Sequence, residues 1–263
     1  MWPGASTQSI ACEVGARGLR PGRSPRRLAD RLVACDLRIE AAWGSRARPL
    51  QYDARMKGHD AALQAAVFDA IAERYDDVFS DKQAQIEALD WLLERLSPGA
   101  RVLDVGSGTG LPTAKALADA GHEVHGIDIS GEMVRIARRN VPAGRFDQVD
   151  VLRLIQPDAH YDAAMAFFSL LMLPKDGVRQ ALGMLRRALR PGGYFLVSMV
   201  EGDLDYESLE FMGQMARLTA FPQAALEALL REQEFEVLGA RGVNFTPRAG
   251  AEPERQLFYR CRV

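Results

Sequence analysis

Two kinds of apolar periodicity alternate along residues 61–263. Spacings of three and four residues predict helices over 61–75, 83–96, 112–120, 133–140, 175–189 and 222–232. Short apolar runs bounded by glycine, proline or charge predict strands over 101–105, 123–129, 146–151, 161–166, 194–200, 235–243 and 256–263. Strands that alternate with helices are typical of a doubly wound α/β fold with a mostly parallel sheet. The last two strands follow one another across a loop at 246–253, so we expect them to form an antiparallel hairpin that completes seven strands.

The first 55 residues do not follow this pattern. They contain ten arginines, no lysine and five acidic residues, a local charge of +5 that leaves −7 for the rest of a chain whose net charge is −2. Glycine and proline interrupt the segment often, which favours a weakly ordered leader over 1–55, dispensable for the chemistry, before a single domain over 56–263. An arginine-rich targeting peptide and translation that begins at Met56 both stay open as alternatives.

Composition excludes several classes of function. A net charge of −2 argues against general attraction to nucleic acid or to acidic membranes. Three scattered cysteines indicate neither a disulfide framework nor a zinc site. No apolar run approaches the roughly 20 residues needed to span a bilayer. We therefore expect a reduced, soluble, cytoplasmic protein without a metal, while the oligomeric state stays open.

The most informative stretch is Arg101–Gly110, where an apolar run leads into an alternating glycine turn. Glycines at positions 106, 108 and 110 allow a tight turn and leave room for a ligand against bare backbone. Asp104 stands at the end of the preceding strand, where open α/β sheets bind ligands. A dinucleotide fingerprint would need glycine at Leu111, and a Walker loop would need Gly-Lys-Ser/Thr; both are missing. A bare strand–turn–helix connection is the structural alternative.

The acidic-x-Gly-x-Gly-x-Gly pattern formed by Asp104, Gly106, Gly108 and Gly110 resembles the first motif of class I S-adenosylmethionine-dependent methyltransferases. The rest of the pattern resembles their small-molecule branch, which includes enzymes of ubiquinone and menaquinone biosynthesis. The resemblance implies a Rossmann-like methyltransferase fold, S-adenosyl-L-methionine as cofactor and methylation of a small molecule. A methyltransferase-like cyclase and a non-catalytic cofactor-binding module stay open as alternatives.

The resemblance also implies which residues hold the cofactor. Asp128, at the end of the second strand, is placed to accept hydrogen bonds from both ribose hydroxyls, and Ser130 is the better candidate to cap the next helix. Asp150 would meet the adenine amino group and the Val151 N–H a ring nitrogen, with Asp147 as a nearby competitor. The expected cofactor contacts are Asp104, Gly106, Ser107, Gly108, Gly110, Asp128, Ile129, Met133, Asp150, Val151, Phe167 and Tyr75.

Aromatic and apolar residues indicate where the acceptor would bind. Tyr75-Asp-Asp-Val-Phe79 resembles a segment that covers the cofactor pocket in the family, and an aromatic face beside a sulfonium is worth roughly 0.5–2 kcal/mol. The fourth strand ends in Ala-Phe-Phe-Ser, without the Asn/Asp-Pro-Pro-Tyr/Phe of nitrogen methyltransferases, so an apolar acceptor wall is expected. Residues 201–221 fall where relatives insert helices that shape this wall. The candidate acceptor contacts are Phe168, Leu171, Tyr206 and Phe211, for which plain packing is an equal alternative.

The sequence selects no catalytic residue. Methyl transfer from a sulfonium is a displacement that mainly needs donor and acceptor held in line, and orientation alone is worth roughly 7–11 kcal/mol. A base is needed only if the acceptor must lose a proton. His122, His125 and His160 lie at or near the starts of strands, away from the expected pocket, and the position of His59 relative to the pocket is undetermined.

Overall fold

The structure is a computed structural model that describes residues 58–79, 81–246 and 253–263. All of these residues belong to one compact unit, Ala47–Val263. The predicted leader over 1–55 lies outside the described residues.

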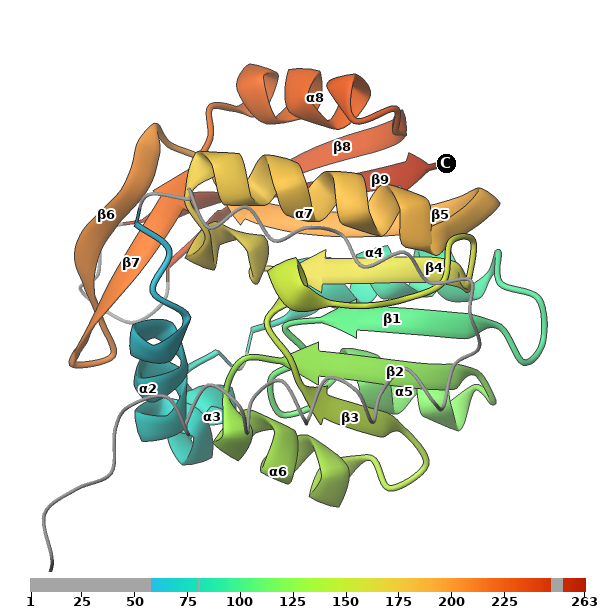
Figure 1. Ribbon diagram of the computed structural model, residues 1–263, viewed down its shortest axis with the longest axis horizontal. Coiled ribbons are helices and arrows are strands. Elements are labelled where there is room, and N and C mark those ends of the chain that lie inside the picture. Colours follow the sequence, from blue (N-terminus) through green and yellow to red (C-terminus); the bar gives the residue numbers. More distant parts are fainter. Residues whose placement is uncertain (1–57, 80, 247–252) are drawn as a thin grey trace, which may run out of the picture. The chain divides into compact units, whose positions relative to one another are not determined.

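Seven strands form one sheet in the order β3-β2-β1-β4-β5-β9-β8 (Figure 1). Strands β1 to β5 are mutually parallel, and β9 is antiparallel to both β5 and β8. The predicted mostly parallel sheet with an antiparallel C-terminal hairpin is therefore confirmed. The strands are β1 (Arg101–Val105), β2 (Glu123–Asp128), β3 (Arg145–Gln148), β4 (Tyr161–Phe167), β5 (Leu189–Val200), β8 (Glu236–Phe245) and β9 (Glu254–Arg262).

Strand β1 lies at the point where the winding direction of the sheet reverses. The chain moves outward from β1 to β2 and β3, and then returns to pair β4 with the other edge of β1. The two neighbouring connections therefore leave in opposite directions and open a crevice at the carboxyl ends of these strands, which is where ligands bind in such sheets.

Helices cover both faces of the sheet because its central strands are apolar on both sides. Val102 faces the layer of α4 and α5, whereas Leu103, on the opposite side of the same strand, faces the layer of α7 and α8. Both side chains are fully buried. The helices are α4 (Gln83–Leu93), α5 (Thr113–Asp119), α6 (Gly131–Asn140), α7 (Lys175–Ala188) and α8 (Gln223–Glu232).

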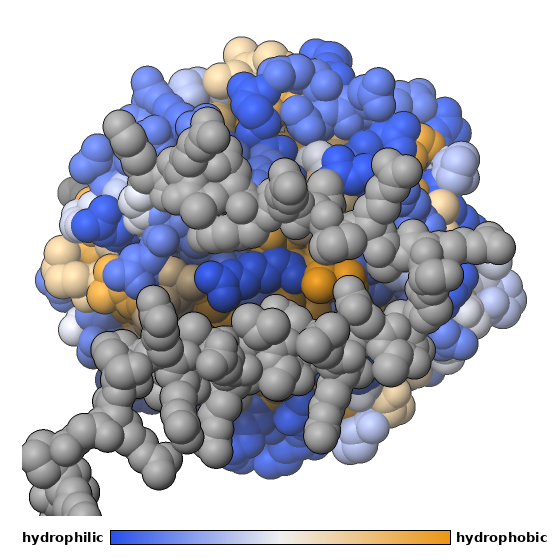
Figure 2. Space-filling view, in the orientation of Figure 1, coloured by the Kyte–Doolittle hydropathy of each residue, from blue (hydrophilic) through white to orange (hydrophobic). Residues whose placement is uncertain are grey.

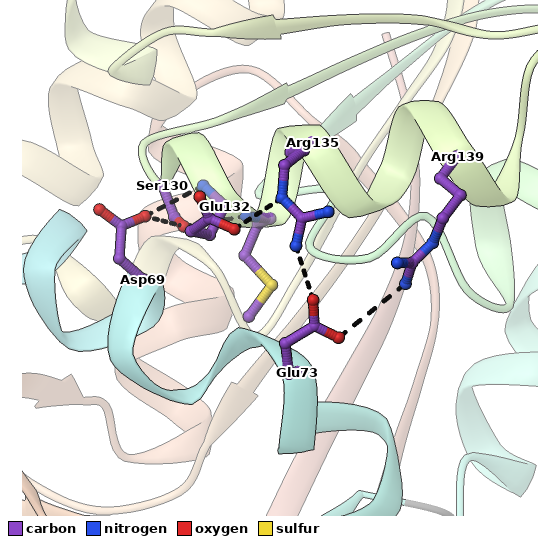
Figure 3. A network of polar contacts seen from close by, with 7 residues as sticks. Asp69, Glu73, Ser130, Glu132, Arg135 and Arg139 are labelled. Carbon is purple, nitrogen blue, oxygen red and sulfur yellow. Dashed lines mark hydrogen bonds and ion pairs between the residues drawn. The ribbon is translucent and has the colours of Figure 1, made fainter. Parts of the chain in front are cut away.

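A helical cap precedes this core. The predicted helix over 61–75 is divided into α2 (Ala61–Ile71), the 3-10 turn η1 (Ala72–Arg74) and α3 (Tyr75–Val78). Asp60 begins α2 by accepting a hydrogen bond from the Leu63 N–H at 3.0 Å. Helix α2 and the turn η1 contact α6 through a network of polar side chains (Figure 3).

The segment at 201–221 is not helical, so that prediction was wrong. It forms a separate two-stranded antiparallel sheet, β6 (Leu204–Phe211) and β7 (Gln214–Ala220). The two residues between the strands, Met212 and Gly213, have φ values of 52° and 81°. Two positive φ angles define the tight turn that matches the twist of a hairpin, and Gly213 makes the second one favourable.

Candidate functional site

A cavity lies at the carboxyl ends of β1, β2 and β4, with the cap on its other side. The space within it measures about 720 Å³ when the open solvent at its mouth is counted. It is lined by His59, Gln64, Phe68, Tyr75, Val105, Gly106, Gly108, Ile127, Asp128, Ile129, Met133, Val149, Asp150, Val151, Phe167, Phe168, Ser169, Leu170, Met172 and Leu173.

The glycine turn supplies bare backbone to this cavity. Gly106 and Gly108 have φ values of 67° and 53°, which side chains rarely adopt. A Cβ atom on Gly106 would lie 2.2 Å from the Cβ of Ser169, so the close approach of that residue requires glycine. A Cβ atom on Gly108 would meet nothing within 4 Å, because this part of the turn borders open space. The turn is thus shaped to receive a ligand against its main chain.

Asp128 joins the end of β2 to the glycine turn. Its Oδ2 accepts a hydrogen bond from the Gly108 N–H and its Oδ1 one from the Ser130 N–H, both at 2.9 Å. Burial raises the pKa of Asp128 to about 6, although the two backbone donors oppose that shift. Each carboxylate oxygen can accept a second hydrogen bond, so Asp128 can bind ligand hydroxyls without releasing the turn. Ser130 caps α6, as predicted, by accepting from the Met133 N–H at 3.1 Å.

Asp104 lies below the turn and is not among the residues that line the cavity. Asp104 is 2% exposed, and its carboxylate accepts a hydrogen bond from Thr113 Oγ1 at 3.2 Å. Burial raises the pKa of Asp104 to about 7; the hydrogen bond from Thr113 lowers it and the charge of Asp128 raises it. Asp104 therefore lies buried beneath the glycine turn. Its contact with the cofactor stays a prediction. Gly110 likewise does not line the cavity, and a Cβ atom there would meet Val141 at 3.0 Å and Ala137 of α6 at 3.5 Å.

Asp150 follows β3, which ends earlier than predicted, and it begins the 3-10 turn η2 (Val151–Arg153). Its Oδ1 accepts from the Leu152 N–H at 3.0 Å, and its Oδ2 lies 3.1 Å from His59 Nε2. Burial acts to raise the pKa of Asp150, but the hydrogen bonds from His59 and Leu152 outweigh it and hold the pKa below its usual value. Asp150 and Val151 both line the cavity, whereas Asp147 pairs with His125 and Arg145 instead.

A second hollow, a groove, shares a wall with the cavity. Phe68, Tyr75, Phe167, Phe168 and Met172 line both hollows, as do Gly106 and Gly108. The groove extends from this shared wall to the β6–β7 hairpin and to the ends of β8 and β9. Figure 2 shows one face of the protein, on which apolar patches interrupt a mostly hydrophilic surface.

Most of the residues predicted for the two sites are brought together. Ile129, Met133, Phe167 and Tyr75 line the cavity; Ser107 lines the groove. Of the four candidate acceptor contacts, Phe168, Leu171 and Phe211 line the groove. Tyr206 lines neither hollow, because its side chain is buried and its hydroxyl accepts from the Asp60 N–H at 3.0 Å.

The sequence analysis did not predict several residues of the cavity wall. Of these, Gln64 could have been predicted from its position in the helix. Gln64 is 1% exposed, and its Nε2 donates to the backbone oxygens of Arg217 at 2.6 Å and Met172 at 3.2 Å. It lies three residues before Val67 and seven before Ile71, so it shares their buried helix face. His59 and Ser169 belong to no periodic pattern. The remaining missed residues are Phe68, Val105, Ile127, Val149, Leu170, Met172 and Leu173.

The cavity suits a polar ligand with an apolar part. Within the described part of the chain, His59 Nδ1 and Ser169 Oγ are buried without hydrogen-bond partners, and both residues line the cavity. Buried polar atoms without partners are rare in proteins and call for an explanation, such as a ligand. The described residues contain no group of three or more His, Cys, Asp or Glu side chains that could hold a metal ion. None of their helices is long and apolar enough to cross a membrane.

The comparisons with known proteins agree with this geometry. Residues 102–193 match the model of the methyltransferase domain family. The chain is 34% identical over 176 residues to the O-methyltransferase cnsE of Penicillium expansum, covering 62% of this chain and 61% of that protein. It is 34% identical over 159 residues to the O-methyltransferase rstn1 of Aspergillus nomiae, covering 55% and 69% respectively. The chain thus spans less than two thirds of the first of these relatives and slightly more than two thirds of the second.

A solved structure extends the likeness to most of the chain. The 1,6-didemethyltoxoflavin-N1-methyltransferase of Burkholderia thailandensis, determined with bound 1,6-didemethyltoxoflavin and S-adenosylhomocysteine, is 26% identical. Its TM-score is 0.61, and the match covers 83% of this chain and 92% of that one. The [4+2]-cyclase SpnF, with 23% identity and a TM-score of 0.62, shares the fold.

The reversal of the sheet's winding at β1, the glycine turn, and the acids Asp128 and Asp150 are typical of one class of protein. It is a doubly wound α/β protein that binds a nucleotide-like ligand at the carboxyl end of its sheet. The chain belongs to the class I S-adenosylmethionine-dependent methyltransferases.

Proposed function

We propose that the protein transfers the methyl group of S-adenosyl-L-methionine to a small, largely apolar molecule. The observation that carries this proposal is the contact between the two hollows: Gly106 and Gly108 border both the cavity and the groove. A donor in the cavity and an acceptor in the groove would therefore meet at one shared wall, and holding two reactants together is the main requirement of this reaction.

Residues of the cavity wall fit the parts of this cofactor. The bare backbone of Gly106 and Gly108 would receive its amino-acid portion, and Asp128 would accept hydrogen bonds from its ribose hydroxyls. Asp150 and the Val151 N–H would meet its adenine. When bound, the cofactor supplies a methyl group on a cationic sulfur. The aromatic rings of Tyr75 and Phe167, which line both hollows, would lie beside that cation.

The shared wall supports an apolar acceptor. Phe167, Phe168 and Met172 border the cavity and the groove, and Leu171 and Phe211 extend the apolar surface within the groove. Burial, followed by the charges of Asp128 and Asp76, raises the pKa of Tyr75 well above its usual value, so its phenol stays protonated at neutral pH. Tyr75 is therefore suited to pack against ligands or to donate a hydrogen bond, and unsuited to act as a base.

We further propose a cytoplasmic location and no nucleic-acid or membrane partner, as the charge balance and cysteine usage indicate. The oligomeric state is left open. Residues 56–263 would form the catalytic domain.

The test combines calorimetry with methyl-labelled cofactor. We expect calorimetry to show that the full chain binds S-adenosylhomocysteine. We also expect it to transfer the labelled methyl group to some members of a panel of small apolar phenols, quinols and ring-nitrogen compounds, and mass spectrometry would detect the labelled products. Absence of S-adenosylhomocysteine binding would contradict the proposal. Binding without transfer to any acceptor would instead favour a cyclase or a non-catalytic module.

A further inference from the structure

Two titratable side chains from distant parts of the chain meet on the cavity wall. His59 comes from the segment that leads into α2, and Asp150 comes from the segment that follows β3. Their side chains are 2% and 8% exposed, and His59 Nε2 lies 3.1 Å from Asp150 Oδ2. Both residues line the cavity together with Ile129 and Val151. The His59–Asp150 pair therefore joins the cap to the part of the cavity wall that follows β2 and β3.

The hydrogen-bond polarity of this pair can be worked out. The low pKa of Asp150 keeps its carboxylate ionised, and an ionised carboxylate only accepts hydrogen bonds. His59 Nε2 must therefore carry a proton and donate it to Asp150 Oδ2. Asp150 Oδ1 is already engaged by the Leu152 N–H. Because each carboxylate oxygen can accept a second hydrogen bond, the part of a ligand that Asp150 recognises must offer N–H or O–H donors.

We propose that His59 is a positioning residue for recognition of the nucleobase. By holding Asp150 Oδ2, it turns the carboxylate toward the exocyclic amino group of the cofactor's adenine, so that the cap takes part in selecting the base. This inference rests on the proposed function, because it assumes that S-adenosylmethionine occupies the cavity. A base with a 6-oxo group in place of the amino group would set a second acceptor against the carboxylate and would be disfavoured.

The neighbouring contacts hold His59 in this position. The next residue, Asp60, donates its backbone N–H to the Tyr206 hydroxyl at 3.0 Å, and it also caps α2. Gln64, one turn further along α2, donates to the backbone of Arg217 and Met172. The position of His59 is thus set by the β6–β7 hairpin as well as by the cap.

The experiment compares two ligands by calorimetry on the full chain. The probes are S-adenosylhomocysteine and its 6-oxo analogue, in which hypoxanthine replaces adenine. We expect the wild-type protein to prefer the adenine ligand by about tenfold or more, the equivalent of one good hydrogen bond. His59→Ala should reduce that preference at least threefold, roughly half of that free-energy difference. His59→Gln, whose amide can still donate to Asp150, should recover part of it.

His122→Ala serves as the matched control, because it removes a histidine that lines neither hollow and leaves the His59–Asp150 pair and its neighbours in place. We expect it to change the affinity for both ligands by the same factor. Equal weakening of both ligands in His59→Ala, or no change in either, would show that His59 does not read the base and would overturn the inference. A wild-type protein that binds neither ligand would instead overturn the proposed function. Thermal unfolding without ligand confirms that each variant is folded.

Discussion

At the scale of single residues, Asp128 holds two elements together. Its two oxygens accept the N–H groups of Gly108 in the glycine turn and Ser130 at the start of α6. Both donors would lose a protein partner if the carboxylate were removed, and an unsatisfied buried donor costs about 1–3 kcal/mol. Asp128 is therefore needed for the shape of the site itself as well as for the proposed ribose contact.

We predict that Asp128→Ala lowers the free energy of unfolding by about 1–3 kcal/mol and weakens S-adenosylhomocysteine binding at least tenfold, a loss of about 1.4 kcal/mol. The stability loss follows from the two abandoned backbone donors. Denaturant unfolding and calorimetry would measure the two effects. Asp119→Ala, at an exposed ion pair with Lys115, is the control and should change neither. Unchanged affinity in Asp128→Ala would contradict the ribose assignment.

Two glycines of the turn should respond differently to the same substitution. Gly106→Ala places a methyl group on Ser169, so we expect it to destabilise the fold by more than the roughly 1 kcal/mol that a positive φ costs by itself. In Gly108→Ala the added methyl group would lie in open space, so we expect only the backbone cost of the positive φ. Its main effect should be to obstruct the ligand. Parallel unfolding and binding curves measure the contrast, and equal stability losses in the two variants would argue against the observed approach of Ser169.

The buried carboxyl of Asp104 predicts a pH dependence. Its pKa is raised to about 7 in the folded state, so the folded protein binds this proton more tightly than the unfolded chain does. Between the unfolded pKa near 4 and about pH 7, each rise in pH therefore favours unfolding through this group. Asp104→Asn still accepts a hydrogen bond from Thr113 but cannot ionise.

We expect Asp104→Asn to be more stable than the wild-type protein at pH 8, by about 1–3 kcal/mol, with a difference that shrinks toward pH 4.5. Urea unfolding of the ligand-free protein at several pH values would measure it. Parallel stability curves for the two proteins would mean that Asp104 titrates normally.

At the scale of elements, the cap is fixed to the core from two sides. Asp69 Oδ1 of α2 accepts from Ser130 Oγ at 2.6 Å and from the Glu132 N–H at 3.1 Å, so it shares in capping α6 (Figure 3). Glu73 lies 2.6 Å from Arg135 and 4.0 Å from Arg139. On the other side, Gln64 and the aromatic rings Phe68 and Phe79 contact the β6–β7 hairpin, where Phe79 stacks on Phe211.

These contacts differ in the free energy that they should contribute. Asp69→Ala removes an acceptor at a helix N-terminus, which typically costs about 1 kcal/mol, and we expect weaker S-adenosylhomocysteine binding because α2 carries part of the cavity wall. Glu73→Ala removes exposed ion pairs, which are worth about 0–1 kcal/mol, and is the matched control. Equal effects of the two variants on stability would show that Asp69 does not act as a cap in solution.

At the scale of the whole molecule, the site exists because the sheet brings distant residues to one edge. The glycine turn follows β1, Asp128 ends β2, Asp150 follows β3, and Phe167 ends β4. Parallel pairing in register, with Val105 beside Ile127 and Asp104 beside Met165, aligns the carboxyl ends of these strands. No part of the chain could form this crevice by itself.

The predicted domain organisation leads to a deletion experiment. We expect removal of residues 1–55 to leave S-adenosylhomocysteine affinity within about twofold, less than 0.5 kcal/mol, because the leader is expected to be dispensable. Calorimetry on the truncated and full-length chains would measure this. A loss of binding would show that the leader contributes to the cofactor site.

Much of the fold could be predicted from the sequence because the patterns that determine it are local. Apolar periodicity predicted the helices and strands of the core, and the spacing of Gly106 and Gly108 predicted a turn that exposes backbone. The insert at 201–221 was predicted wrongly, because the resemblance to relatives that insert helices there implied helices, whereas the Met212–Gly213 turn makes it a hairpin. Burial of residues in this hairpin depends on contact with the cap, and no local sequence pattern predicts that contact.

The sequence by itself determined the fold class and the positions of the glycine turn and of the acids at the strand ends, because strand ends and glycine turns are encoded within a few residues. Only the tertiary structure decided which side chains complete the walls. His59 meets Asp150 across 91 positions, and Gln64 meets Arg217 across 153. It also placed Asp104 beneath the turn and Tyr206 behind the wall. Such contacts depend on how whole elements pack, and the free energy of packing is shared among residues that are distant in sequence.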